Sequence, residues 1–252
     1  MTTIIHLSDM HIGTEDKKLL PVLIETVNRL KPDVIVISGD FTQRAKSSEF
    51  QVANHIIKQL TCKNILPVAG NHDIPLYRIF ERVLMPFNKY KRFISNNFNL
   101  TYVDHDIAMI GLNSVTPYVI QDGFVTDDQL KIIQAFFAEN EISNRIVVMH
   151  HNMIRPEYHK VILNLETVIK TLAESKVNYI LSGHLHDVCI ERIERDYIKY
   201  PMYAITAGTA LSHRLRTQPN SFNFMTIDKD AFDIKVYCRE GEQYLPKDIA
   251  CF

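Results

Sequence analysis

Residue types that bind metal ions recur directly after five short apolar runs of the chain. They stand in the segments Asp9-Met10-His11, Gly39-Asp40, Gly70-Asn71-His72-Asp73, His150-His151 and Gly183-His184-Leu185-His186. A mixture of carboxylate, imidazole and amide groups suits Mn, Fe, Zn, Ni or Co better than it suits Ca or Mg, which prefer oxygen ligands alone. Together, the segments predict a transition-metal centre.

Each segment taken alone also has an ordinary interpretation. An Asp-x-His sequence is common on protein surfaces, a Gly-Asp pair after a strand commonly forms a turn, and the Gly-Asn-His-Asp segment at residues 70–73 could form an ordered loop. The metal-site interpretation is favoured because all five segments occur in one chain and each follows an apolar run.

The elements that must position these residues follow from hydrophobic periodicity. The five apolar runs, at residues 4–7, 34–37, 65–68, 146–149 and 179–181, are predicted strands, and in α/β sheets sites assemble at the carboxyl ends of strands. Further strands are expected at residues 102–103, 107–112 and 203–205, and a hairpin at 222–227 and 232–237. Amphipathic patterns predict helices at residues 18–30, 47–60, 127–137 (capped by Thr126) and 165–174.

This alternation of strands and helices predicts a layered α/β domain with a largely parallel sheet, followed by antiparallel strands. The sequence shows no repeat, low-complexity segment or linker, so one domain is expected over residues 1–252. Residues 75–99 are basic and aromatic, and we expect them to cover one edge of the site as helices and loops.

Two local features are expected to bring the polar side chains together. Gly39, Gly70 and Gly183 allow sharp turns. The members of the pairs Asp9/His11 and His184/His186 are two residues apart, so each pair faces one side if its backbone is locally extended.

In this order the five segments resemble the calcineurin-like metallophosphoesterase superfamily, and their pattern is most similar to its bacterial cyclic-nucleotide phosphodiesterase-like branch. The resemblance covers most of the chain, from residue 4 to about residue 210. It implies a four-layer α/β/β/α sandwich with two mixed β-sheets and two divalent metal ions, Mn or Fe first and Zn, Ni or Co as alternatives. Residue by residue, it implies one ion on Asp9, His11 and His186, a second on Asn71, His150 and His184, and Asp40 between them.

The same resemblance implies hydrolysis of a phosphoester by a metal-bridging hydroxide. His72 would act near the leaving oxygen as an acid or a charge stabiliser, and Asn71 would also contact the substrate. Asp73 is a second catalytic candidate, which either orients His72 or caps the segment that follows. For His151, support of the ligands or simple burial is expected rather than metal binding.

The substrate expected from this pattern is a small nucleotide-like phosphodiester, with a cyclic nucleotide as one candidate. Gln43 stands where protein Ser/Thr phosphatases carry Asp, and His72 stands where lipid A precursor pyrophosphatases usually carry Arg, which disfavours both branches. A nucleotide-sugar pyrophosphatase, a phosphomonoesterase, a nuclease and a non-catalytic scaffold of the same fold remain alternatives.

Arginine side chains are natural phosphate ligands because their planar donors match two oxygens. Arg44 and Arg214 are therefore candidate substrate-binding residues, and Asn113, His213 and Arg216 are further candidates for the same role. Ordinary solvated surface charge is the competing interpretation for each arginine.

Composition narrows the class of protein. The chain has 28 basic and 29 acidic residues, so no strong nucleic-acid signal arises. Its apolar runs are too short to cross a membrane, and its four cysteines are widely scattered. With no recognisable signal peptide, a cytoplasmic location is expected, and the oligomeric state is left open. Other polar residues are interpreted structurally: Asp104-His105-Asp106 as a hairpin turn, His6 as a core residue, and His55 and His159 as residues without partners nearby in sequence.

Overall fold

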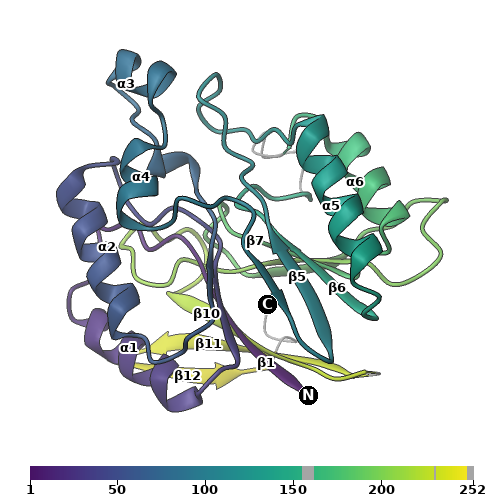
Figure 1. Ribbon diagram of the computed structural model, residues 1–252. Coiled ribbons are helices and arrows are strands. Elements are labelled where there is room, and N and C mark those ends of the chain that lie inside the picture. The colour runs from purple at the N-terminus through teal and green to yellow at the C-terminus, as the bar shows by residue number, and fades with distance from the viewer. Residues whose placement is uncertain (155–161, 230, 249–252) are drawn as a thin grey trace.

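Two β-sheets packed face to face form the centre of the molecule, and helices cover the outer face of each sheet (Figure 1). The computed structural model describes residues 1–154, 162–229 and 231–248. His159 and Cys251 lie outside these ranges. The arrangement is the α/β/β/α sandwich with two mixed sheets that the family resemblance implied.

The first sheet has the strand order β12-β11-β10-β1-β2-β3. Strands β1, β2 and β3 run parallel, whereas β10, β11 and β12 continue the sheet antiparallel. The strands are β1 (Thr2–Leu7), β2 (Val34–Ile37), β3 (Ile65–Pro67), β10 (Ser221–Ile227), β11 (Phe232–Glu240) and β12 (Gln243–Lys247).

The second sheet has the order β4-β5-β6-β7-β9-β8. Its four central strands are parallel, and β4 and β8 close the two edges antiparallel. The strands are β4 (Thr101–Val103), β5 (Ile107–Gly111), β6 (Asn144–Val148), β7 (Tyr179–Ser182), β9 (Tyr203–Thr206) and β8 (Cys189–Arg192).

Helices α1 (Leu19–Leu30) and α2 (Ser47–Gln59) cover the first sheet, and α5 (Asp127–Glu139) and α6 (Leu165–Glu174) cover the second. The shorter helices α3 (Ile79–Leu84) and α4 (Asn88–Phe93) lie beyond α2, where α3 projects from the body of the molecule (Figure 1). Thr126 caps α5 as predicted, since its hydroxyl accepts a hydrogen bond from the Gln129 amide at 3.3 Å.

The strands that lead to the site are buried on both faces, which explains their unbroken apolar sequences. In β2, Val34 and Val36 enter the core between the two sheets, and Ile35 and Ile37 pack under α1 and α2. Each strand is therefore held from both sides up to the residue where its polar segment begins.

Strands β8 and β12 were not predicted, because both are edge strands with few apolar residues. Their sequences, Cys-Ile-Glu-Arg and Gln-Tyr-Leu-Pro-Lys, carry little hydrophobic alternation. Among the described residues, every helix is too short or too polar to cross a lipid bilayer.

Candidate metal centre

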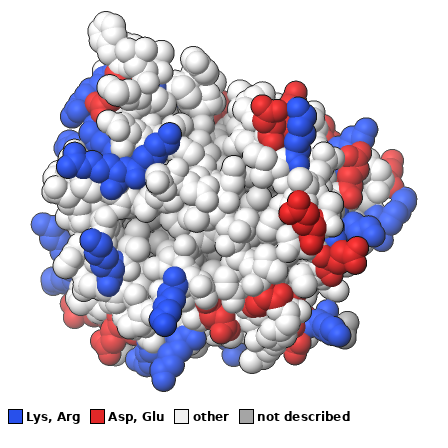
Figure 2. Space-filling model, in the orientation of Figure 1, with Lys and Arg blue, Asp and Glu red and all other residues white. Residues whose placement is uncertain are grey.

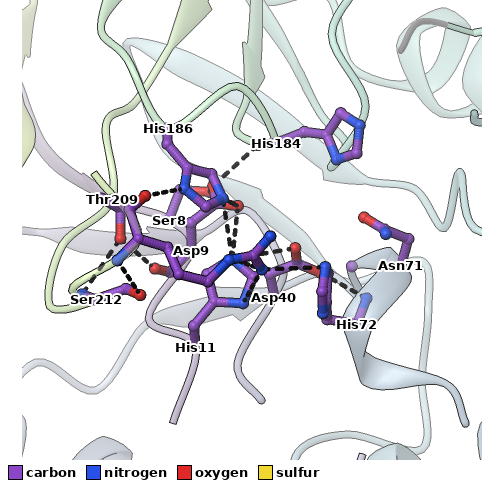
Figure 3. A network of polar contacts seen from close by, with 12 residues as sticks. Ser8, Asp9, His11, Asp40, Asn71, His72, His184, His186, Thr209 and Ser212 are labelled. Carbon is purple, nitrogen blue, oxygen red and sulfur yellow. Dashed lines mark hydrogen bonds and ion pairs between the residues drawn. The ribbon is translucent and has the colours of Figure 1, made fainter. Parts of the chain in front are cut away.

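All seven predicted metal ligands come together at the carboxyl ends of the parallel strands, where loops from the two sheets meet. Figure 3 shows Asp9, His11, Asp40, Asn71, His184 and His186 among them. The loop after β1 carries Asp9 and His11, and the loop after β2 carries Asp40. The other ligands follow strands β3, β6 and β7: Asn71, His150, His184 and His186.

Asp9, His11 and His186 form the first group of candidate ligands. The Nε2 atoms of His11 and His186 are 3.0 Å apart, and Oδ1 of Asp9 lies 3.6 Å from the first and 3.3 Å from the second. This Asp9 oxygen is buried and has no hydrogen-bond partner among the described residues. A buried carboxylate oxygen facing two imidazole nitrogens is the donor set that a divalent cation needs.

His150, His184 and Asn71 form the second group. His150 Nε2 lies 3.1 Å from His184 Nδ1 and 3.0 Å from Oδ1 of Asn71. The Asn71 amide is oriented by its Nδ2, which donates to the carbonyl of Ile120 at 3.1 Å, so that its oxygen faces the imidazoles. This group also offers a mixed nitrogen and oxygen donor set.

Asp40 lies between the two groups. Its Oδ2 is 3.5 Å from His11 Nε2, and its Oδ1 is 3.5 Å from His150 Nε2. Each carboxylate oxygen thus faces a different group, which is the geometry of a ligand shared by two ions. The donors therefore fit two divalent cations, as the resemblance implied.

The backbone of five of the seven predicted ligands is left-handed and not extended, so the expected basis for the paired motifs was wrong. Asp9 and His11 have φ of 50° and 46°, Asp40 has 52°, and His184 and His186 have 71° and 66°. Left-handed conformations at non-glycine residues cost energy and cluster at functional sites. The resulting turns direct His184 and His186 into different ligand groups.

Glycines allow the loops of the two sheets to approach closely. A Cβ on Gly183 would lie 1.8 Å from Ser8 Oγ and 2.5 Å from Asp9 Oδ2. A Cβ on Gly39 would lie 2.5 Å from Nδ1 of His150, and Gly39 itself has φ of +96°. Ligands from both sheets reach one place because these positions carry no side chain.

Backbone carbonyls select the ring nitrogen that each histidine offers. His150 Nδ1 donates to the carbonyl of Ser38 at 2.7 Å, and His186 Nδ1 donates to the carbonyl of Arg214 at 2.6 Å. When either ring is neutral, its proton therefore lies on Nδ1 and the Nε2 lone pair faces the acidic residues, as metal binding by imidazole requires.

The buried charges at the centre favour cations. Burial acts to raise the pKa of Asp9 and Asp40, but nearby imidazoles, His186 for Asp9 and His150 for Asp40, hold the pKa of both carboxyls below the usual range. Burial acts to lower the pKa of His150, whereas the Asp40 carboxylate raises it to about 9. Both aspartates are therefore ionised at neutral pH, and positive charge compensates them.

His72 and Arg214 lie together beside the ligands. His72 Nδ1 donates to the carbonyl of Gln43 at 2.9 Å, and its Nε2 lies 3.2 Å from Nη1 of Arg214 (Figure 3). The same Arg214 nitrogen is 3.4 Å from Nδ1 of His11. The potential ligand atoms of His72, His11 and Asp40 all lie within 4.8 Å of one another, so the geometry of His72 suits either a metal ligand or a group that acts on the substrate.

A pocket of about 200 Å³ opens next to this pair. Asn71, His72, Arg44 and Arg214 line it. The Arg44 guanidinium lies 5.4 Å from the centre of the Tyr77 ring. The structure therefore brings both predicted substrate-binding arginines to one cavity, whereas His213 and Arg216 are exposed.

The contacts of the Asp73 side chain fit neither of the two roles that the sequence suggested for it. Its carboxylate accepts hydrogen bonds from the backbone amides of Gly70, Thr42 and Phe41 at 2.9, 3.0 and 3.3 Å. Burial and the nearby Asp40 raise its pKa to about 7. The side chain thus ties the loop after β2 to the loop after β3, rather than orienting the His72 ring or capping a later segment.

The remaining histidines and acids have structural surroundings. His151 is buried, and its Nδ1 lies 2.8 Å from Ser114 Oγ, behind His150. Asp104 binds the amides of Asp106 and Ile107 in the β4–β5 turn, which confirms the predicted hairpin. His6 is buried against Ser38, as expected of a core residue.

Two residues that support Asp9 were not identified from the sequence. The Ser8 hydroxyl donates to Asp9 Oδ2 at 2.5 Å, and the Thr209 hydroxyl donates to the Asp9 carbonyl at 2.6 Å. Thr209 follows β9, 200 residues from Asp9, and no local pattern marks it. For Ser8, the only signal in the sequence was its position directly before Asp9.

Comparison with known proteins agrees with this geometry. The family model described as calcineurin-like phosphoesterase matches residues 2–188. The chain belongs to this family. That membership confirms the predicted class, the metal-dependent phosphoester hydrolases, and the family binds two divalent metals at such clusters of His and Asp.

Curated relatives of the chain carry phosphodiesterase names. A probable cyclic nucleotide phosphodiesterase of Coxiella burnetii is 26% identical over 163 residues, which are 62% of this chain and 60% of that protein. A probable glycerophosphodiester phosphodiesterase of Arcobacter nitrofigilis is 25% identical over 203 residues, 73% of this chain and 72% of that protein. A purple acid phosphatase from yellow lupin shares the fold with a TM-score of 0.71 at 10% identity, and the match covers 97% of this chain but 52% of the lupin protein.

Proposed function

We propose that the protein is a two-metal phosphodiesterase that acts on a small nucleotide-like diester. The observation that carries this proposal is the position of Asp40, whose two carboxylate oxygens each lie 3.5 Å from an imidazole of a different ligand group. Two divalent ions held in that way would clamp a phosphate and acidify a water molecule into a nucleophile. Mn or Fe is proposed because the donors mix nitrogen and oxygen.

His72 and Arg214 supply the groups that act on the substrate. His72 Nδ1 donates to the Gln43 carbonyl, so Nε2 faces the pocket and Arg214; when Nε2 carries a proton, it would donate that proton to the leaving oxygen. Arg214 adds a positive charge at the same place, and its planar donors suit phosphate oxygens. Both residues that fill these roles, His72 and Arg214, line the same pocket.

The diester substrate is supported by the chemistry that the relatives' names share. Cyclic nucleotides and glycerophosphodiesters are both phosphate diesters, and proteins with these names match this chain. The pocket beside His72 is lined by Ile74, Leu76 and Ile120 and by the exposed Arg44, which suits a small organic group attached to a phosphate. A cytoplasmic location and the choice of a cyclic nucleotide stay predictions, as does the single domain.

The test is a hydrolysis panel with the Mn-reconstituted protein. The substrates are bis-p-nitrophenyl phosphate, p-nitrophenyl phosphate, a cyclic nucleotide, single-stranded DNA and a nucleotide sugar. We expect the diesters to be turned over fastest, and Asp40→Ala and His184→Ala to abolish metal-dependent turnover. His105→Ala is the matched control, because His105 lies in the β4–β5 turn and its side chain is 77% exposed.

Full activity of both site variants would overturn the assignment of the centre. Faster turnover of the monoester or of the nucleotide sugar would overturn the diester preference and would favour a phosphomonoesterase or a pyrophosphatase. A protein that binds metal at these residues and hydrolyses nothing in the panel would support the scaffold alternative.

A further inference from the structure

Helix α3 turns its apolar side chains toward solvent. Phe80 is 86% exposed, Leu84 is 73% exposed, and Ile79 and Val83 are exposed beside them. Soluble proteins usually direct such side chains into the core and leave only scattered apolar residues outside. Helix α3 shows the opposite orientation, because its four apolar residues face solvent and not the core.

The charged residues of the same helix are turned inward. Arg82 is buried, and its guanidinium donates to three backbone carbonyls, those of Pro117 at 2.7 Å, Pro75 at 3.2 Å and Val119 at 2.5 Å. Glu81 is paired with Arg78 and Lys89. These bonds hold α3 in its inverted orientation, so its apolar face is a built feature and not a loosely attached segment.

The bonds of Arg82 also join α3 to a second exposed segment. The loop at residues 117–120 carries Tyr118, which is 83% exposed, and Ile120, which is also exposed. We call the combined feature the α3 surface. It consists of Tyr77, Ile79, Phe80, Val83, Leu84, Met85, Tyr118 and Ile120. Helix α3, which carries four of these residues, projects from one end of the molecule (Figure 1).

Basic residues adjoin the α3 surface. Residues 75–99 contain five basic residues and one acidic residue, whereas the whole chain has 28 basic and 29 acidic residues. Figure 2 shows Lys and Arg side chains gathered just below the white projection at the top of the molecule. Lys91 and Arg92 are basic residues of the neighbouring helix α4, and Arg44 and Lys46 lie on the segment before α2.

We propose that the α3 surface docks on an anionic lipid surface. A convex apolar tip with aromatic side chains suits insertion of roughly 5–10 Å into the boundary between headgroups and acyl chains. The neighbouring lysines and arginines complement the negative headgroups. Pairing with a second copy of the chain is less favoured, because it would bring two groups of basic residues together, and like charges that face each other across an interface repel.

This docking face adjoins the mouth of the metal site. Leu76 and Ile120 line the pocket that contains Asn71 and His72, and the Ile120 carbonyl accepts the hydrogen bond that orients Asn71. A lipid surface bound at α3 therefore lies next to the phosphoester site. The docking itself is independent of the proposed reaction, so it is tested by binding.

The test is flotation of the full chain with lipid vesicles. Vesicles of phosphatidylcholine and phosphatidylserine in a three-to-one ratio are compared with vesicles of phosphatidylcholine alone. We expect binding to the anionic vesicles that weakens as salt is raised. Phe80→Ser/Leu84→Ser is expected to lower the partition coefficient about tenfold or more, because two apolar side chains no longer leave water.

Two further variants separate the apolar and the electrostatic contributions. Lys91→Glu/Arg92→Glu is expected to lower binding to anionic vesicles about tenfold. Leu245→Ser is the matched control, because Leu245 is an exposed residue of β12 in the other half of the molecule, and its binding should equal that of the unmodified chain.

Circular dichroism melting checks that each variant folds. Failure of the unmodified chain to bind anionic vesicles, or equal binding by Phe80→Ser/Leu84→Ser, would overturn the proposal. Dimerisation in analytical ultracentrifugation that this double variant abolishes, with no vesicle binding, would replace the lipid by a second copy.

Discussion

Gly183 follows β7 at a point where the loops of the two sheets approach each other closely. Replacement by alanine would place a methyl carbon 1.8 Å from the Ser8 hydroxyl oxygen and 2.5 Å from Asp9 Oδ2. Ordinary contacts of such atoms are near about 3.5 Å, so either the loops separate or Ser8 turns away. If Ser8 turns, its 2.5 Å hydrogen bond to Asp9 is lost.

The cost of Gly183→Ala follows from these contacts. Overpacking a close contact costs about 1–3 kcal/mol, and a hydrogen bond to a charged group contributes about 1.5–3 kcal/mol. The lower entropy of the unfolded alanine chain offsets about 0.4–1 kcal/mol. We therefore expect the metal-free protein to lose about 2–5 kcal/mol in its free energy of unfolding.

The assay combines urea unfolding of the metal-free protein with metal analysis after reconstitution. Gly241→Ala is the matched control: Gly241 has φ of +61°, and no other atom lies within 4 Å of the place that an added methyl carbon would take. Its replacement should cost about 1 kcal/mol through backbone strain, with metal content unchanged. Gly183→Ala should also lose metal, because the methyl group displaces the Asp9 carboxylate.

A Gly183→Ala protein as stable and as fully metal-loaded as the control would refute the close-approach reasoning. Ser8→Gly/Gly183→Ala provides a second check, since removing the Ser8 side chain should recover part of the lost stability. Equal stability of the single and double variants would show that the contact with Ser8 is unimportant.

Three other predictions concern His72, Arg214 and His6. His72→Asn should lower kcat for a diester about a hundredfold, more for poor leaving groups, with unchanged metal content; a loss of metal would instead make His72 a ligand. Arg214→Gln should raise KM for bis-p-nitrophenyl phosphate about tenfold, whereas the exposed neighbour Arg216→Gln should not, and equal kinetics of the two variants would remove Arg214 from the site. Burial lowers the pKa of His6 from its ordinary value to about 3. As the pH falls below about 6.5, His6 is protonated in the unfolded chain but not in the folded protein, so the free energy of unfolding decreases. Between about pH 7 and pH 5, His6→Gln should lose about 2 kcal/mol less unfolding free energy than the unmodified chain, measured with urea; parallel pH profiles would contradict this pKa.

The parts of the fold that local sequence patterns determine were predicted closely. Strand β2 and helix α6 have the predicted bounds, because a four-residue run of Val and Ile and a regular apolar period of 3.6 leave little choice. Strands β8 and β12 escaped prediction because pairing with β9 and β11, and not their own composition, makes them strands. Tertiary context outweighs propensity at such edges.

At the site, the identities of the residues that meet could be predicted, but their conformations could not. Asp9, Asp40 and His184 follow strands whose carboxyl ends share one edge, so their convergence follows from topology. Their left-handed backbone follows from contacts between loops distant in sequence, such as the hydrogen bond from the His11 amide to the Asp40 carbonyl at 2.9 Å. The tie made by Asp73 between two loops depends on the same long-range packing.

The left-handed backbone of five candidate ligands has a consequence for attempts to make this protein more heat-resistant. Each of these positions costs about 1 kcal/mol or more relative to a glycine with the same dihedral angles. Selection for folding alone would therefore favour glycine or asparagine at Asp9, His11, Asp40, His184 and His186, and would remove the metal donors as it did so. A stabilised enzyme has to be sought with these five residues held constant, and thermal tolerance gained elsewhere in the chain.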